Sequence, residues 1–129
     1  MIAVDTNVLV RLVTNDDAAQ AKRASALFAA NDIWIAKTVL LESEWVLRYS
    51  YQLDRAAILR GLTGLLGLPN VAAEDQVAVA RALQWYQAGL DLADALHVAS
   101  RDEAPRFATF DDKFIKRAVK LTGVDVFKP

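Results

Sequence analysis

The sequence predicts an α/β fold in which helices cover both faces of a central, mainly parallel sheet. Short apolar runs with the length of strands recur along the chain, and longer amphipathic segments separate them. Such alternation is typical of parallel sheets that lie between two layers of helices. At 129 residues the chain is long enough to bury one proper core. We therefore expect a single three-layer α/β/α domain over residues 1–129, with four to five short strands.

Four apolar runs are the strand candidates, and one further segment is ambiguous. The runs are residues 2–4, 33–36, 107–110 and 124–127. The last of them is the expected edge strand. The segment 71–73 is either a short strand or a bare connection.

Seven segments have the apolar spacing of amphipathic helices. They are residues 8–13, 18–30, 39–51, 55–68, 76–88, 92–101 and 112–121. Residues with short polar side chains stand before several of them and can cap their first turns. We expect Thr6 or Asn7 to cap the first helix, Thr38 the third, Asp54 the fourth and Asp91 the sixth.

The helix at 39–51 predicts an apolar stripe and a polar face. The stripe consists of Leu41, Trp45, Val46 and Tyr49. Glu44 and Arg48 would form an ion pair between successive turns on the wet side. Glu42 falls at the edge of the apolar stripe, where a carboxylate needs an explanation. It is either a rim residue that reaches solvent or part of a functional site.

Composition excludes several classes of protein. No apolar run reaches the roughly 18 residues of a membrane span, no signal peptide is recognisable, and mean hydropathy is +0.18. The chain has no cysteine, so disulfides and thiolate metal sites are excluded and a cytoplasmic location is the default expectation. The net charge of −1 gives no global attraction for polyanions, which would have to bind through a local patch.

Four acidic residues occupy equivalent places in the predicted elements. Asp5 and Asp111 directly follow strands, whereas Glu42 and Asp94 lie in the early turns of helices. The carboxyl ends of parallel strands face one edge of a sheet, so we expect the four side chains to converge there. Clustered carboxylates repel one another unless a hard cation neutralises them, and oxygen ligands suit Mg²⁺ or Mn²⁺. Taken alone, this segment favours a simple helix cap at Asp5 over a catalytic role.

This ordered set of acids resembles the motifs of PIN-domain ribonucleases, above all the VapC-type toxins of bacterial type II toxin–antitoxin pairs. The motifs are Asp-Thr-Asn at 5–7, Glu42, Asp94 within the segment 91–97, and Thr-Phe-Asp at 109–111. The resemblance extends over the whole chain. It implies a PIN-like fold, an RNA substrate and an antitoxin that blocks the site. It also implies that Asp5, Glu42, Asp94 and Asp111 are the catalytic acids and bind Mg²⁺ or Mn²⁺.

The resemblance also suggests roles for neighbouring residues. Thr6 and Thr109 are similar to the hydroxyl residues that orient the acids. Asp112 competes with Asp111 for the fourth position, and we favour Asp111 because it directly follows the strand. A metal-bound water would attack the phosphodiester, so no protein nucleophile is needed. His97 is the only histidine, and a structural role is the simpler reading.

RNA would need cations near these acids. The candidates are Lys113, Lys116, Arg117 and Lys120, with Lys37 and Arg11 as possible additions. An ordinary solvated helix face explains the same residues equally well. Two other functions stay open. Haloacid-dehalogenase-like phosphatases also place an aspartate after the first strand, but their second acid is replaced here by Asn7. An inactive PIN-like RNA-binding or scaffold module would not need all four acids.

The helices at 39–53 and 55–68 carry more apolar surface than one sheet face covers. Gly61, Gly64 and Gly67 recur at every third position and permit close approach along one side of the second of these helices. We therefore expect a homodimer, and an apolar groove near the acids that receives an antitoxin peptide. The alternative is that these residues complete the core of a monomer.

Overall fold

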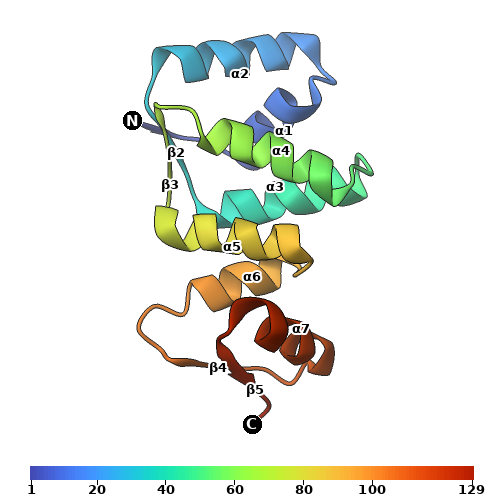
Figure 1. The fold of residues 1–129 in the computed structure, drawn as a ribbon. Coiled ribbons are helices and arrows are strands. Elements are labelled where there is room, and N and C mark those ends of the chain that lie inside the picture. The colour runs from blue at the N-terminus through green and yellow to red at the C-terminus, as the bar shows by residue number, and fades with distance from the viewer. The chain divides into compact units, whose positions relative to one another are not determined.

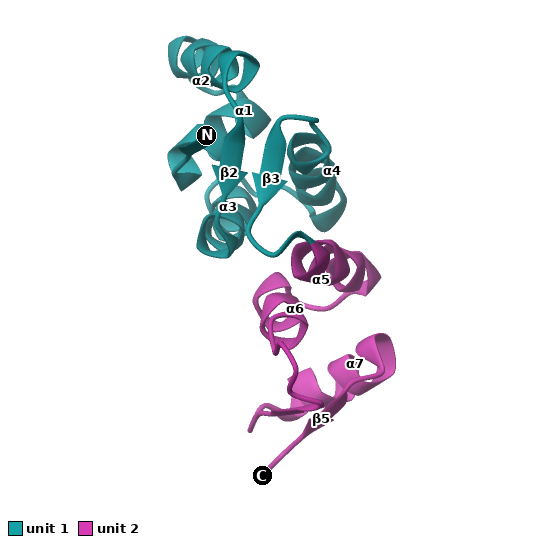
Figure 2. Ribbon diagram, turned by 90° about the vertical axis from the view of Figure 1, so that its left-hand side faces the viewer, with its two compact units in different colours: residues 1–76 teal, residues 77–129 magenta.

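The computed structural model describes all 129 residues, which form seven helices and five short strands (Figure 1). The chain divides into two compact units, residues 1–76 and residues 77–129 (Figure 2). Each unit contains its own parallel sheet. The predicted α/β class with parallel strands is therefore confirmed. None of the helices has the length and apolar content needed to cross a membrane.

Unit 1 contains a three-stranded parallel sheet and four helices. Its elements are β1 (Ile2–Ala3), α1 (Thr6–Thr14), α2 (Ala18–Ala30), β2 (Ile33–Ile35), α3 (Lys37–Tyr49), α4 (Arg55–Leu66) and β3 (Val71–Ala73). The strand order is β1-β2-β3, and Ile33 in the central strand pairs with Ile2 on one side and Val71 on the other. The ambiguous segment 71–73 is thus a strand.

Unit 2 contains three helices and a two-stranded parallel sheet. Its elements are α5 (Gln76–Ala88), which starts at the unit boundary, α6 (Leu92–Ala99), β4 (Arg106–Ala108), α7 (Asp112–Thr122) and β5 (Asp125–Phe127). Arg106 pairs with Asp125, and Ala108 pairs with Phe127. All seven predicted helices are present, with ends that differ by a few residues from those expected.

The core of unit 1 follows the alternation that a half-buried strand requires. Ile33 and Ile35 in β2 are fully buried, whereas Trp34 between them is partly exposed. Helix α1 packs against α2 and α3, and α3 packs against α4, which runs beside it next to β2 and β3 (Figure 1). The helices contribute fully buried aliphatic side chains to this core: Leu9, Leu47, Ile58 and Leu62. Burial of each such side chain contributes about 1.5–3 kcal/mol.

The prediction of which face of α3 packs into the core is wrong. The buried residues of this helix are Leu40, Ser43, Glu44 and Leu47. Glu44 is only 2% exposed, whereas Trp45 and Tyr49 of the predicted stripe are 54% and 58% exposed. Glu44 can lie inside because Arg48 neutralises it, with 3.0 Å between Arg48 Nε and Glu44 Oε2. The ion pair therefore exists, but it faces inward. Glu42 is exposed and does not border the apolar face.

Two predicted helix caps are also wrong. Asp5 is the N-cap of α1, which confirms the capping reading of Asp5, whereas Thr6 and Asn7 lie inside the helix. Helix α3 begins at Lys37, so Thr38 lies inside it, and its N-cap residue Ala36 makes no side-chain capping bond. The backbone N–H of Lys37 instead donates to Glu74 Oε1 at 2.9 Å. In both cases a partner other than the nearest hydroxyl satisfies the orphan N–H groups of the first turn.

One glycine of α4 allows close helix packing within the chain. A Cβ atom at Gly61 would lie 3.0 Å from Val13 Cγ1 of α1. A Cβ atom at Gly64 would meet nothing within 4 Å, and Gly67 is the C-cap of the helix. The close approach predicted from the glycine spacing therefore occurs at Gly61, between α1 and α4.

Candidate active site

The end of β1 and the start of α1 bring two of the predicted acids together in unit 1. Asp5 caps α1, and its Oδ1 accepts a hydrogen bond of 2.8 Å from the backbone N–H of Thr6. The Thr6 side chain is buried, and its hydroxyl donates to Glu42 Oε1 at 2.5 Å. Thr6 therefore holds Asp5 with its backbone and Glu42 with its side chain.

Sheet topology explains why Asp5 and Glu42 meet. Strands β1 and β2 are parallel neighbours, with Ala3 opposite Trp34. The helices that follow them, α1 and α3, therefore both begin at the carboxyl edge of the sheet. Both carboxylates are exposed there, and Asp5 Oδ2 and Glu42 Oε2 accept no hydrogen bond within the chain. These two oxygens are available to a cation.

Unit 2 places Asp94 in an acidic environment. Asp94 lies in the first turn of α6, whose N-cap is Asp91. Partial burial raises the pKa of Asp94, and the negative charges of Asp91 and Asp111 raise it further. Positive charge on His97 and Arg117 lowers the same pKa. Asp94 therefore lacks a close cation that would fully neutralise it.

The structure distinguishes Asp111 from its neighbour Asp112. Asp111 caps α7 by accepting a bond of 3.1 Å from the N–H of Phe114, and its own N–H donates to Thr109 Oγ1 at 3.2 Å. Asp112 instead pairs with Lys128, whose Nζ lies 3.1 Å from Oδ1. Thr109 thus orders the backbone at Asp111, whereas Asp112 is already bound to a cation. These contacts support Asp111 as the fourth acid.

Asp91 is the residue of this region that sequence analysis undervalued. It was expected only as a helix cap, and its Oδ1 does accept from the N–H of Ala93 at 2.9 Å. It is also the first of the charged neighbours that raise the pKa of Asp94. The spacing of three residues between Asp91 and Asp94 places both on one face of a helix start and could have indicated this coupling.

The basic residues predicted to bind RNA differ in how many ion pairs and hydrogen bonds they already form within the chain. The side chains of α7 are exposed and form no ion pair: Lys113, Lys116, Arg117 and Lys120. Lys37 is bound to Asp75, with 3.0 Å between Nζ and Oδ2. Arg11 is bound to Asp16, Gln20 and Tyr51. The exposed face of α7 is therefore the freest source of positive charge in unit 2.

The acids are hard oxygen donors, which fit Mg²⁺ or Mn²⁺ by their chemistry. In unit 1 the fit is supported by the two unbonded carboxylate oxygens of Asp5 and Glu42. Neither unit by itself gathers three or more histidine, aspartate or glutamate side chains around one point. Each unit thus presents predicted acids in a pair: Asp5 with Glu42, and Asp94 with Asp111.

The sequence model of the PIN domain family matches residues 2–120, which is most of the chain and includes parts of both units. The chain belongs to the PIN domain family. PIN domains are generally nucleases, and this membership confirms the predicted fold family. It does not support the haloacid-dehalogenase-like alternative. Searches among curated proteins and among solved structures found no match to this PIN domain.

Proposed function

We propose that this PIN domain is a metal-dependent endoribonuclease and the toxin of a VapC-type toxin–antitoxin pair. The contact that carries the proposal is the bridge from Thr6 to both Asp5 and Glu42. A buried hydroxyl that orients an exposed carboxylate is what a metal-binding site requires of its supporting residues. The unneutralised charge around Asp94 supports the same conclusion, because it favours a divalent cation as the missing partner.

Asp5, Glu42, Asp94 and Asp111 would hold the cation, and residues 1–129 would form one PIN-like domain. A bound Mg²⁺ or Mn²⁺ would lower the pKa of a water molecule and shield charge on the phosphodiester. Thr6 fixes the orientation of Glu42, and Thr109 orders the backbone that presents Asp111. These threonines are positioning residues, because they act through the acids.

The proposed substrate is single-stranded or loop RNA. The exposed cations of α7 begin two residues after Asp111 and can bind phosphates of the strand. Phosphate contacts of this kind supply affinity that does not depend on the sequence of the RNA. His97 is exposed, and its charge acts on Asp94 without a direct contact being needed.

We propose that the antitoxin binds a groove between the end of α1 and α4, which none of the four acids lines, and not a groove at the acids as expected from the sequence. The groove has a volume of about 550 Å³. Its apolar wall is made by Leu12, Val13, Leu53, Ala57 and Leu65, with Arg60 as its charged residue. An amphipathic peptide can lay its apolar side in such a groove. The open space beside Gly64 leaves room for the backbone of this peptide.

We also propose a cytoplasmic homodimer, supported by exposed Trp45 and Tyr49 on α3.

RNA cleavage by the purified chain tests the function directly. We expect hydrolysis of single-stranded RNA in Mg²⁺ or Mn²⁺ and none in excess EDTA. Asp5→Asn and Asp94→Asn should each lower the rate by at least roughly 10²-fold. The matched control is Asp112→Asn, which removes a neighbouring acid that pairs with Lys128 and should keep most of the activity.

Circular dichroism would show that the variants keep their fold. Full activity in EDTA would rule out the metal-dependent mechanism. A well-folded chain that binds RNA but never cleaves it would support the inactive binding module instead.

A further inference from the structure

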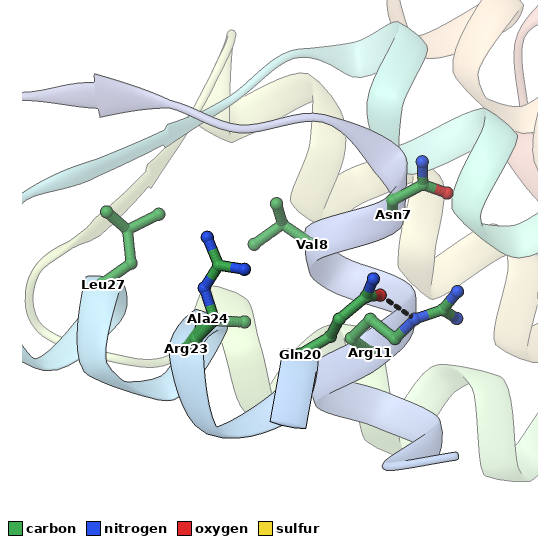
Figure 3. Close-up of a pocket in the computed structure, with 7 residues that line it drawn as sticks. All are labelled: Asn7, Val8, Arg11, Gln20, Arg23, Ala24 and Leu27. Carbon is green, nitrogen blue, oxygen red and sulfur yellow. Dashed lines mark hydrogen bonds between the residues drawn. The ribbon is translucent and has the colours of Figure 1, made fainter. Parts of the chain in front are cut away.

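A cleft in unit 1 lies between α1 and α2, and its lining begins at Asn7, two residues after Asp5. Its volume is about 480 Å³. It is lined by Asn7, Val8 and Arg11 from α1 and by Gln20, Arg23, Ala24 and Leu27 from α2 (Figure 3). Asn7 directly follows Thr6, the residue that bonds Glu42. The cleft therefore begins in the same helical turn as the candidate metal site.

The lining of this cleft is cationic. It contains two guanidinium groups, Arg11 and Arg23, and no carboxylate. Arg11 is held in place: its Nε donates to Gln20 Oε1 at 2.7 Å and its Nη1 donates to Tyr51 Oη at 3.1 Å. Asp16, 3.2 Å from the same Nη1, neutralises part of its charge. The Tyr51 and Asp16 contacts raise the pKa of Arg11, so it stays protonated.

Arg23 has a different position. It makes no hydrogen bond or ion pair within the chain, although it lines the same cleft as Arg11 (Figure 3). Its full charge is therefore available to a ligand. Val8, Ala24 and Leu27 add an apolar surface beside the two guanidinium groups, which suits the face of a ribose or a base.

We propose that this cleft binds the RNA backbone next to the cleaved bond, with Arg23 contacting a phosphate. This inference rests on the proposed ribonuclease function. A strand whose phosphodiester reaches Asp5 can continue along α1, where Asn7, Val8 and Arg11 line the cleft. The guanidinium fork matches phosphate geometry, and the apolar wall accepts the attached nucleoside. Arg11, already fixed by Gln20 and Tyr51, forms the second cationic wall.

An acidic peptide offers carboxylates to the same arginines, and the test separates it from RNA. Binding is measured by fluorescence anisotropy with a short, labelled single-stranded oligoribonucleotide of random sequence and with an oligoglutamate peptide. The protein is the full chain carrying Asp94→Asn, which prevents cleavage and leaves unit 1 unchanged. Arg23→Ala is compared with Lys22→Ala, which removes an equal charge from the adjacent residue of α2 that does not line the cleft.

We expect Arg23→Ala to weaken RNA binding about tenfold at low salt. It should also flatten the plot of log affinity against log salt concentration by about 0.7, the value for one phosphate contact on a single strand. Arg23→Lys should recover part of the affinity. Lys22→Ala should bind RNA like the parent. In the active chain, Arg23→Ala should raise KM and leave kcat nearly unchanged.

An unchanged RNA affinity and salt slope in Arg23→Ala, in a chain that cleaves RNA, would overturn this inference and leave the proposed function standing. Arg23-dependent binding of the peptide without an effect on RNA would assign the cleft to a protein partner and likewise overturn it. Failure of the proposed function has a different signature, because no variant would then cleave RNA. Circular dichroism confirms that Arg23→Ala is folded, which is expected of an exposed residue.

Discussion

Thr6 is the residue on which the acid pair of unit 1 depends. Its hydroxyl is the one hydrogen-bond donor that the structure gives to the Glu42 carboxylate. Thr6→Val keeps the shape of the side chain and removes this bond. We expect a loss of about 1.5–3 kcal/mol in the free energy of unfolding, the range for a bond to a charged group. RNA cleavage should fall by about 10- to 100-fold.

Thermal unfolding and cleavage assays of Thr6→Val check both effects, and Thr6→Ser is the control that restores the hydroxyl. Wild-type activity in Thr6→Val would show that Glu42 does not need this orientation.

Asp94 makes folding stability depend on pH. Its pKa is raised in the folded state, so the folded chain binds more protons than the unfolded chain between the two pKa values. Stability therefore falls as pH rises through this window, and the loss is complete above the folded pKa. In metal-free buffer, Asp94→Asn should be more stable than the wild type at about pH 7. The difference should vanish at about pH 3, below the unfolded value.

Urea unfolding of Asp94→Asn and the wild type at the two pH values measures this difference. A variant that is less stable than the wild type at neutral pH would show that Asp94 is well neutralised within the chain.

At the scale of elements, Gly61 sets the distance between α1 and α4. A Cβ atom there would press on Val13, whereas one at Gly64 would enter open space. Both substitutions by alanine gain the same helix propensity, up to about 1 kcal/mol. We expect Gly64→Ala to stabilise the chain and Gly61→Ala to be less stable than Gly64→Ala by about 1–3 kcal/mol. Denaturant unfolding of both variants measures this difference. Equal stabilities of the two variants would mean that α1 shifts to accommodate the added methyl group at no cost in free energy.

Helix positions could be predicted from the sequence because apolar spacing and caps are local signals. The face of α3 that packs into the core could not be predicted from the sequence, because the apolar pattern of this helix fits two neighbouring faces. Glu44 is buried, paired with the partly exposed Arg48, and Trp45 is exposed. A partner one turn away offsets part of the free-energy cost of burying a charge, and the hydrophobicity of single residues does not reveal this.

The segment 71–73 could not be assigned as a strand from the sequence alone. Its three residues carry too little pattern to separate a strand from a connection. Pairing with β2 makes this segment a strand, because each of its three residues pairs with a residue of β2. A partner distant in the sequence is the part of a fold that local periodicity does not contain.

The sequence predicts that all four acids converge, and that prediction of a shared site stays a proposal. Asp5 and Glu42 meet as expected of acids that follow neighbouring parallel strands. Their link through Thr6 and the influence of Asp91 on Asp94 were not specified, because both depend on side-chain contacts. The PIN domain family model matches residues 2–120, the range in which all four acids lie.

We expect the whole molecule to form a homodimer. The exposed rings of Trp45 and Tyr49 lie in a tilted arrangement, with 5.0 Å between their centroids, and form an aromatic patch on α3. Aromatic side chains of this kind contribute strongly to interfaces. Sedimentation of the chain at micromolar concentration should give a dimer, and Trp45→Ser with Tyr49→Ser should give a monomer. A monomeric wild type would refute the homodimer.

The central claim of the proposed function is that Asp5, Glu42, Asp94 and Asp111 hold the same cation. Calorimetric titration of Mn²⁺ into the wild type, Asp5→Asn, Asp94→Asn and the double variant tests it most directly. We predict that each single variant loses at least about tenfold in affinity and that the double variant loses little more, since coupled ligands are not additive. Mn²⁺ binding that is unchanged in either single variant would contradict the claim, as would two losses that add as independent sites.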